Sequence, residues 1–202
     1  MREEIIQWHN FTELSKENQA IVINETRQSD SYLNYPWYEC IDEDFRAILE
    51  LLGYYNIETY FTGFYSQGDG ASFDGRYLYA KGATKALRAY APRDEELNRI
   101  ALALQDIQKK CRYDLGSTID TNGRYSHEMT MSCLNWSNND LVEEDTVDEY
   151  TDEILELHRD LARWYYKALD NYYDCLNTDE TIAEHLEASC QEWSINEDGE
   201  IL

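Results

Sequence analysis

The loop at residues 66–71, SQGDGA, combines residue types at a spacing that suits a binding site. Its two glycines allow backbone N–H groups to approach a ligand, while Ser66, Gln67 and Asp69 supply a hydroxyl, an amide and a carboxylate. These groups suit a cation, a polar small molecule or an arginine side chain of a partner protein. A phosphate is disfavoured, because the GxxxxGK[ST] pattern is absent and the charge of Asp69 repels it.

A turn without any ligand explains the same loop. Glycine supplies the positive φ of a tight turn, and Asp and Ser side chains commonly bond to the backbone of their own turn. Both interpretations stay open, and the loop is kept as a candidate site for a ligand or a partner. Its residues are Ser66, Gln67, Gly68, Asp69, Gly70 and Phe73.

A second candidate surface is a line of carboxylates near the start of a predicted C-terminal helix. Eight of the 17 residues from 144 to 160 are predicted to lie on this line. They place about one charge per ~3 Å of helix axis, close to the ~3.4 Å of one DNA strand. Such a line would fit a cationic groove that normally holds nucleic acid; the alternative is an ordinary solvated helix face. The residues are Glu144, Asp145, Asp148, Glu149, Asp152, Glu153, Glu156 and Asp160.

Other groups of reactive residues are weaker candidates. His127 and Glu128, predicted on a strand, would form an acid–base pair with Asp69 or Asp120, but a lone histidine on a strand is usually structural. His158 lies among acids of the C-terminal helix, where a solvated face is expected rather than a set of ligands. Because no Ser-His-Asp order, HExxH or GxSxG occurs, we assign no catalytic residue and do not favour an enzyme.

The cysteines and histidines do not form a metal-binding pattern. The chain has five cysteines, an odd number, without CxxC, and four scattered histidines. We therefore expect reduced thiols, as in a cytosol, and neither a metal site nor a cofactor.

The charge of the chain limits its partners. Its 41 Asp and Glu residues outnumber 17 Lys and Arg residues, which gives a formal net charge of −24. Such a charge opposes direct binding to nucleic acid or to anionic membranes. No apolar stretch approaches the ~18–20 residues of a spanning helix, and the N-terminus does not resemble a secretion signal. The expected partner is a protein with a basic surface.

The hydrophobic periodicity predicts six helices and two β-hairpins. The hairpins have their turns at residues 67–71 and, within 111–136, at Asn122–Gly123, and the C-terminal tail is expected to add an edge strand. The predicted helices cover residues 15–27, 42–52, 82–90, 94–110, 142–176 and 178–188.

These elements predict a single α+β domain over residues 1–202, with a core at 41–136 and an acidic helical part at 137–202. An antiparallel sheet of about four strands, from two hairpins, packs against several helices that include a long acidic C-terminal helix. Aromatic residues crowd that helix at adjacent positions, so some rings must lie outside its main buried stripe. These rings are compatible with an interface, including that of a homodimer.

The segment 61–77, FTGFYSQGDGASFDGRY, resembles a pattern close to SGFxSQGDGAxFxG. This pattern is shared by phage and prophage proteins that are often labelled antitoxins of toxin–antitoxin systems; Thr62 stands where serine is usual. The resemblance continues through YAPRDEEL at 90–97, GSTI and TNGRYSH in the second hairpin, and the aromatic helix. It covers most of the chain and implies a phage protein in the host cytoplasm, without a defined activity.

Three functional hypotheses follow. The favoured one is an acidic, phage-encoded inhibitor that binds a host protein, of an anti-defence or anti-CRISPR kind, by DNA mimicry of a cationic groove. The second is an antitoxin that masks a toxin. The third is a small-molecule or nucleotide-binding protein, or an enzyme, that uses the SQGDGA loop.

Overall fold

The chain divides into two compact units of helices and strands. The computed structural model describes residues 7–29, 31–137, 148–195 and 201. The larger unit lies within residues 38–170, and the smaller one combines described residues of 1–37 and 171–202. None of the described helices is both long and apolar enough to cross a membrane.

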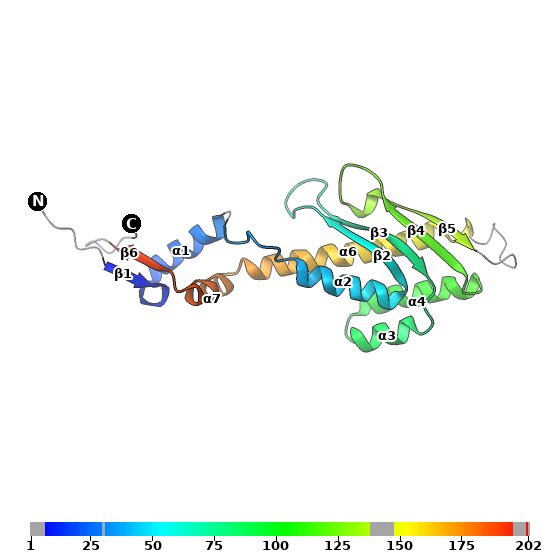
Figure 1. The fold of residues 1–202 in the computed structure, drawn as a ribbon, viewed down its shortest axis with the longest axis horizontal. Coiled ribbons are helices and arrows are strands. Elements are labelled where there is room, and N and C mark those ends of the chain that lie inside the picture. Colours follow the sequence, from blue (N-terminus) through cyan, green and yellow to red (C-terminus); the bar gives the residue numbers. More distant parts are fainter. Residues whose placement is uncertain (1–6, 30, 138–147, 196–200, 202) are drawn as a thin grey trace, which may run out of the picture. The chain divides into compact units, whose positions relative to one another are not determined.

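A four-stranded antiparallel sheet in the order β2-β3-β4-β5 is the framework of the larger unit (Figure 1). Phe61 pairs with Ala71 and Thr121 with Met131, so β2–β3 and β4–β5 form the two predicted hairpins. The strands are β2 (Tyr54–Phe61), β3 (Ala71–Leu78), β4 (Leu115–Thr121) and β5 (Met131–Ser137).

The connection between β4 and β5 is longer than the predicted Asn-Gly turn. It spans residues 122–130 and includes the short 3-10 helix η2 (Glu128–Thr130). The Thr130 hydroxyl bonds to the carbonyls of Tyr125 and His127, which holds the chain in a turn and prevents strand pairing there. The prediction that His127 and Glu128 lie on a strand is therefore wrong.

The helices of this unit begin and end at residues whose chemistry sets those limits. Gly53 ends α2 with a φ of +103°, and the Asp94 carboxylate accepts the Leu97 N–H at 2.8 Å at the start of α4. The helices are α2 (Glu39–Leu52), α3 (Ala83–Tyr90), α4 (Glu95–Lys110) and α6 (Thr151–Leu176), whose residues up to 170 belong here.

The predicted helix 142–176 is interrupted at Tyr150. Asp148 and Glu149 are helical, Tyr150 lies in a turn, and α6 runs from Thr151. Residues 142–147 lie outside the described part of the chain. The run of carboxylates is therefore not carried by one continuous helix among the described residues.

Phe45 of α2 joins helices and sheet in the core of the larger unit. Its ring stacks on Tyr165 of α6 with a centroid distance of 4.4 Å, and it meets Phe73 of β3 edge-on at 5.8 Å. All three rings are buried. The apolar stripe of α4, with Leu97, Ile100, Leu104 and Ile107, is buried as well.

His158 belongs to this core, although it was expected on a solvated face. It is fully buried, its Nδ1 lies 2.8 Å from the Tyr54 hydroxyl, and its Nε2 has no hydrogen-bond partner among the described residues. Burial lowers the pKa of His158 to about 3. The imidazole is therefore a neutral core residue.

The smaller unit brings the two ends of the chain together. Strands β1 (Gln7–Asn10) and β6 (Glu192–Ile195) form a separate antiparallel pair, so the C-terminal strand does not extend the main sheet. Helices α1 (Lys16–Gln28) and α7 (Asp179–Ser189) complete it, with η1 (Phe11–Glu13). Its core contains Phe11, Leu14, Val22, Tyr32, Ile182 and Leu186.

Replacing His158 will change how stability depends on pH. The pKa of about 3 in the folded protein lies below the ordinary 6.5, so the unfolded chain takes up the proton first as the pH falls. The His158 contribution to stability is therefore lost progressively below pH ~6.5. The free energy of unfolding of the wild type should decrease between pH 7 and pH 5. We expect His158→Leu to remove roughly 2 kcal/mol of this decrease, as measured by urea unfolding. His185→Leu, at an exposed position, is the control, and identical pH profiles for His158→Leu and the wild type would contradict this account.

Candidate functional site

Two loops meet at the same end of the main sheet, residues 62–70 between β2 and β3 and residues 122–130 between β4 and β5 (Figure 1). A Cβ atom at Gly70 would lie 2.8 Å from the His127 ring, and one at Gly68 would lie 3.7 Å from the Tyr125 ring. Such an approach at Gly70 leaves no room for a side chain. The structure therefore joins the SQGDGA loop to the TNGRYSH segment, and we call the two loops together the loop end.

The Asp69 carboxylate stabilises its own loop. Its Oδ2 accepts the backbone N–H groups of Tyr65 at 2.9 Å and Ser66 at 2.6 Å. Gly68 has a φ of +94°, and Thr62 and Gly70 exchange two hydrogen bonds across the base of the loop. These contacts are those of a self-supporting turn.

The six predicted loop residues have different roles in this geometry. Phe73 is a core residue and Gly70 is buried against the second loop, whereas Ser66 and Gln67 are exposed. Large side chains are also exposed nearby: Tyr65 is 81%, Met129 63% and Tyr125 53% exposed. The accessible surface of the loop end is thus formed by side chains from both loops.

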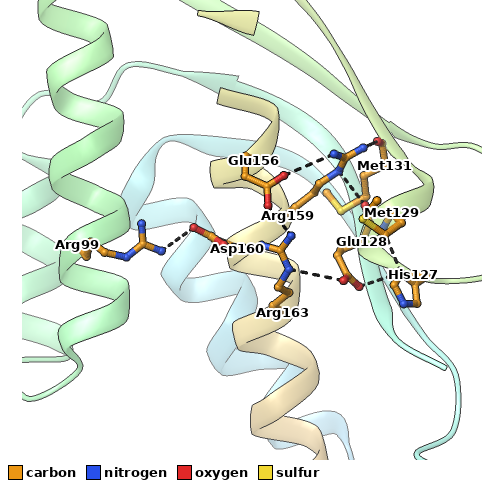
Figure 2. A network of polar contacts seen from close by, with 9 residues as sticks. All are labelled: Arg99, His127, Glu128, Met129, Met131, Glu156, Arg159, Asp160 and Arg163. Carbon is orange, nitrogen blue, oxygen red and sulfur yellow. Dashed lines mark hydrogen bonds and ion pairs between the residues drawn. The ribbon is translucent and has the colours of Figure 1, made fainter. Parts of the chain in front are cut away.

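Glu128 ties the second loop to helix α6 (Figure 2). One carboxylate oxygen lies 3.5 Å from Nε of Arg163, and the other lies 2.9 Å from Nδ1 of His127. Arg159 adds two bonds to backbone, donating to the Glu128 and Met131 carbonyls at 3.1 Å each. Both ends of η2 are therefore held by α6.

The same arginines bind acids of their own helix. Arg163 contacts Glu156 and Asp160 at 2.5 Å each, and Asp160 also accepts from Arg99 of α4 at 2.5 Å (Figure 2). The hydrogen bond from Arg163 lowers the pKa of Glu156. Arg99, Arg159, Arg163, Glu128, Glu156 and Asp160 will be called the arginine clamp.

The clamp divides the predicted line of carboxylates. Glu156 and Asp160 are paired with arginines, so their charges are largely compensated inside the molecule. Glu144 and Asp145 lie outside the described residues. The other four are exposed: Asp148, Glu149, Asp152 and Glu153.

A cleft of about 490 Å³ opens in the larger unit between the start of α2, the end of β2 and the loop 122–130. A volume of ~300–1,000 Å³ is typical of small-ligand sites. On one wall the Asp42 carboxylate accepts Nε–H of Arg46 at 2.7 Å, the Tyr165 hydroxyl at 3.0 Å and the Thr59 hydroxyl. Its lining residues are Tyr38, Glu39, Asp42, Arg46, Thr59, Tyr60, Phe61, Ser126 and Tyr165.

Hydrogen bonding keeps Asp42 ionised. Burial by itself would raise the pKa of Asp42, but the bonds from Arg46, Thr59 and Tyr165 outweigh burial and lower it. Burial and the neighbouring Asp42 charge raise the pKa of Tyr165. Asp42 is therefore a fixed negative charge, while Tyr165 stays a neutral donor.

The cleft and the clamp were not found in the sequence. A signal was present for one part of the cleft, because Asp42 and Arg46 stand four residues apart on a predicted helix. Part of the clamp carries a similar signal, because Glu156 and Arg159, like Asp160 and Arg163, stand three residues apart on the predicted helix. The contact of Arg99 with Asp160 carries none, since the two residues are 61 positions apart.

The described histidines, cysteines and acids form neither a metal cluster nor a disulfide. No group of three or more His, Cys, Asp or Glu residues within the described ranges is arranged to hold a metal ion. All five cysteines are described, and none forms a disulfide. Cys111 follows α4, and Cys133 lies on β5.

Removing the Asp69 carboxylate will loosen the first loop. Asp69→Ala deletes the acceptor of two backbone N–H groups, so we expect faster amide exchange at Tyr65 and Ser66 and a loss of roughly 1 kcal/mol in the free energy of unfolding. The matched control is Asp120→Ala, an exposed acid at the end of β4. Unchanged exchange at Tyr65 and Ser66 would show that the carboxylate does not hold the loop.

Breaking the clamp will free the second loop. Arg163→Gln leaves Glu128, Glu156 and Asp160 with fewer cationic partners. We therefore expect the free energy of unfolding, measured by heat or urea, to fall by roughly 1–2 kcal/mol. Amide exchange in residues 122–130 should rise more than in the rest of the sheet. Arg93→Gln, at an exposed position before α4, removes the same charge as a control. Equal effects of the two variants would argue against the clamp.

Comparison with known proteins places the larger unit in a family. No curated protein and no solved structure matches the chain significantly. A family model described as a domain of unknown function matches residues 37–179, which include the loop end, the clamp and the cleft. The chain therefore belongs to the DUF8835 family.

Proposed function

We propose that this chain is a non-enzymatic protein that binds and inhibits another protein through its loop end. One observation carries the proposal: two loops from separate hairpins contact each other, and Tyr65 in the first loop and Tyr125 and Met129 in the second are exposed. Tyrosine and methionine are enriched in protein interfaces, where an aromatic ring contributes large contact area at a small entropy cost. Ser66 and Gln67 add exposed hydrogen-bonding groups beside them.

The internal contacts favour tight binding by this surface. Asp69 braces the first loop, and the arginine clamp holds the second to α6. A surface that is already ordered loses less conformational entropy on association. The Asp69 and Glu128 carboxylates of the loop end are engaged by backbone N–H groups, by His127 and by Arg163, which is why we propose binding rather than catalysis.

The charge defines the proposed partner. A net charge of −24 favours a protein with a basic surface, and the resemblance to phage proteins leads us to propose a host protein in the host cytoplasm. A nucleic-acid-handling protein of a defence system has such a surface. DNA mimicry is proposed here only for the exposed acids Asp148, Glu149, Asp152 and Glu153, because Glu156 and Asp160 are paired with arginines.

Affinity capture with matched baits tests this proposal. The baits are the wild type, a loop variant with Tyr65→Ser and Met129→Ser, an acid variant with Asp152→Asn and Glu153→Gln, and a control with Leu102→Ser and Leu134→Ser. The control also removes two exposed apolar side chains, from α4 and β5. We expect one discrete partner from host lysate to be retained by the wild type and the control, and to be lost from the loop variant by about tenfold or more.

The other outcomes separate the alternatives. Loss from the acid variant alone, with elution by DNA, would favour mimicry by α6 over recognition by the loop end. A small toxin retained at high salt would favour an antitoxin. A loop variant that retains every protein captured by the wild type would contradict the proposal.

A further inference from the structure

The cleft beside the loop end has chemistry that neither the family description nor the proposed interface assigns. Tyr38, Tyr60 and Phe61 contribute aromatic rings to it, and Tyr38 and Phe61 meet edge-on with a centroid distance of 5.1 Å. Tyr165 extends this aromatic lining at the Asp42 wall. Ser126 belongs to the loop 122–130, so the cleft opens directly beside the loop end.

The electrostatic surroundings of the cleft are negative. Glu39 is exposed at the cleft, and Asp42 carries a charge fixed by its hydrogen bonds. The hydroxyl of Tyr60, a lining residue, lies 2.7 Å from Glu58 and 3.3 Å from Asp74. The hydrogen bond to Glu58 raises the pKa of Tyr60 to about 12, so the Tyr60 side chain is uncharged near neutral pH.

Arg46 is the single cation among the described residues that line the cleft, and its bonds are directed into the protein. Its Nε–H donates to Asp42, Nη1 donates to the Ile57 carbonyl at 2.5 Å, and Nη2 donates to the Thr59 hydroxyl at 2.6 Å. The positive end of helix α2 also lies here, but Glu39 and Asp42 occupy its first turn. An anion would therefore meet two carboxylates and a guanidinium that is already paired.

We propose that this cleft binds an organic cation, an ammonium or guanidinium group on a short apolar stem. The group belongs to an arginine or lysine side chain of the partner protein. Aromatic faces attract such cations, Glu39 supplies a counter-charge, and the rings pack against the stem. The source in a partner protein rests on the proposed function, whereas binding of the cation does not. A free amine has the same chemistry and is distinguished by the experiment.

Titration of the ¹⁵N-labelled protein at 150 mM NaCl tests the proposal. The probes are arginine amide, a short peptide with one central arginine, and inorganic phosphate. We expect the two cations to shift amide signals around Glu39, Phe61 and Ser126, and the peptide to bind more tightly because it also touches the loop end. Phosphate should leave these signals unchanged.

Three single substitutions locate the binding. Ser126→Trp fills the cleft and should weaken binding of arginine amide about tenfold or more, and Glu39→Gln should weaken it about threefold to tenfold. Glu50→Gln removes the same charge from an exposed position near the other end of α2 and should change the affinity by less than about twofold. Unfolding measurements on each variant separate loss of binding from loss of fold.

Each result supports or overturns one claim. Equal weakening by Glu39→Gln and Glu50→Gln, or binding that survives Ser126→Trp, overturns the cation site and leaves the proposed interface standing. Shifts caused by phosphate also overturn it. Arginine amide binding that is sensitive to Ser126→Trp, together with no gain for the peptide, supports the cleft while identifying a free amine as its ligand.

Discussion

The charged contacts around Arg163 hold together the surface on which this account depends. Arg163 reaches Glu128 in the second loop and Glu156 and Asp160 on its own helix, so one guanidinium connects the loop, α6 and, through Asp160, Arg99 of α4. Without this contact the nine residues between β4 and β5 would have to be ordered by their own short-range bonds, against the entropy of a long loop. The first loop packs on the second through Gly68 and Gly70, so its position depends on the same clamp.

The structure uses its charges in two different ways. Carboxylates that face arginines, such as Glu156 and Asp160, stabilise the fold, whereas Glu39 at the cleft and Asp152 and Glu153 at the start of α6 are exposed to solvent. A residue type alone does not distinguish the two uses: Asp69 resembles a ligand group in the sequence, yet its oxygen is bonded to the N–H groups of Tyr65 and Ser66. The accessible surface of this loop end is supplied by Ser66 and Gln67 and by the exposed Tyr65 and Tyr125, and it is the surface for which we propose partner binding.

Local signals explain how far the sequence predicted this fold. The helix ends at Ser15, Asp94 and Gly53 could be predicted, because capping depends on residues only a few positions apart in the sequence. The pairing of β1 with β6 and the contact of Tyr165 with Asp42, 123 residues apart, come from packing between distant segments and left no periodicity to detect. The tight turn predicted at Asn122–Gly123 was too short for a related reason. The Thr130 hydroxyl and the arginine clamp stabilise a longer connection, which the dipeptide alone does not predict.

We propose that the loop end, held by the clamp, is the surface that contacts the partner. Hydrogen–deuterium exchange of the full chain, with and without its captured partner, tests this most directly. We expect slower exchange in residues 62–70 and 122–130 on binding, with little change in the rest of the main sheet. Protection confined to residues 148–160, with both loops unchanged, would contradict it and would place recognition on the carboxylates of α6.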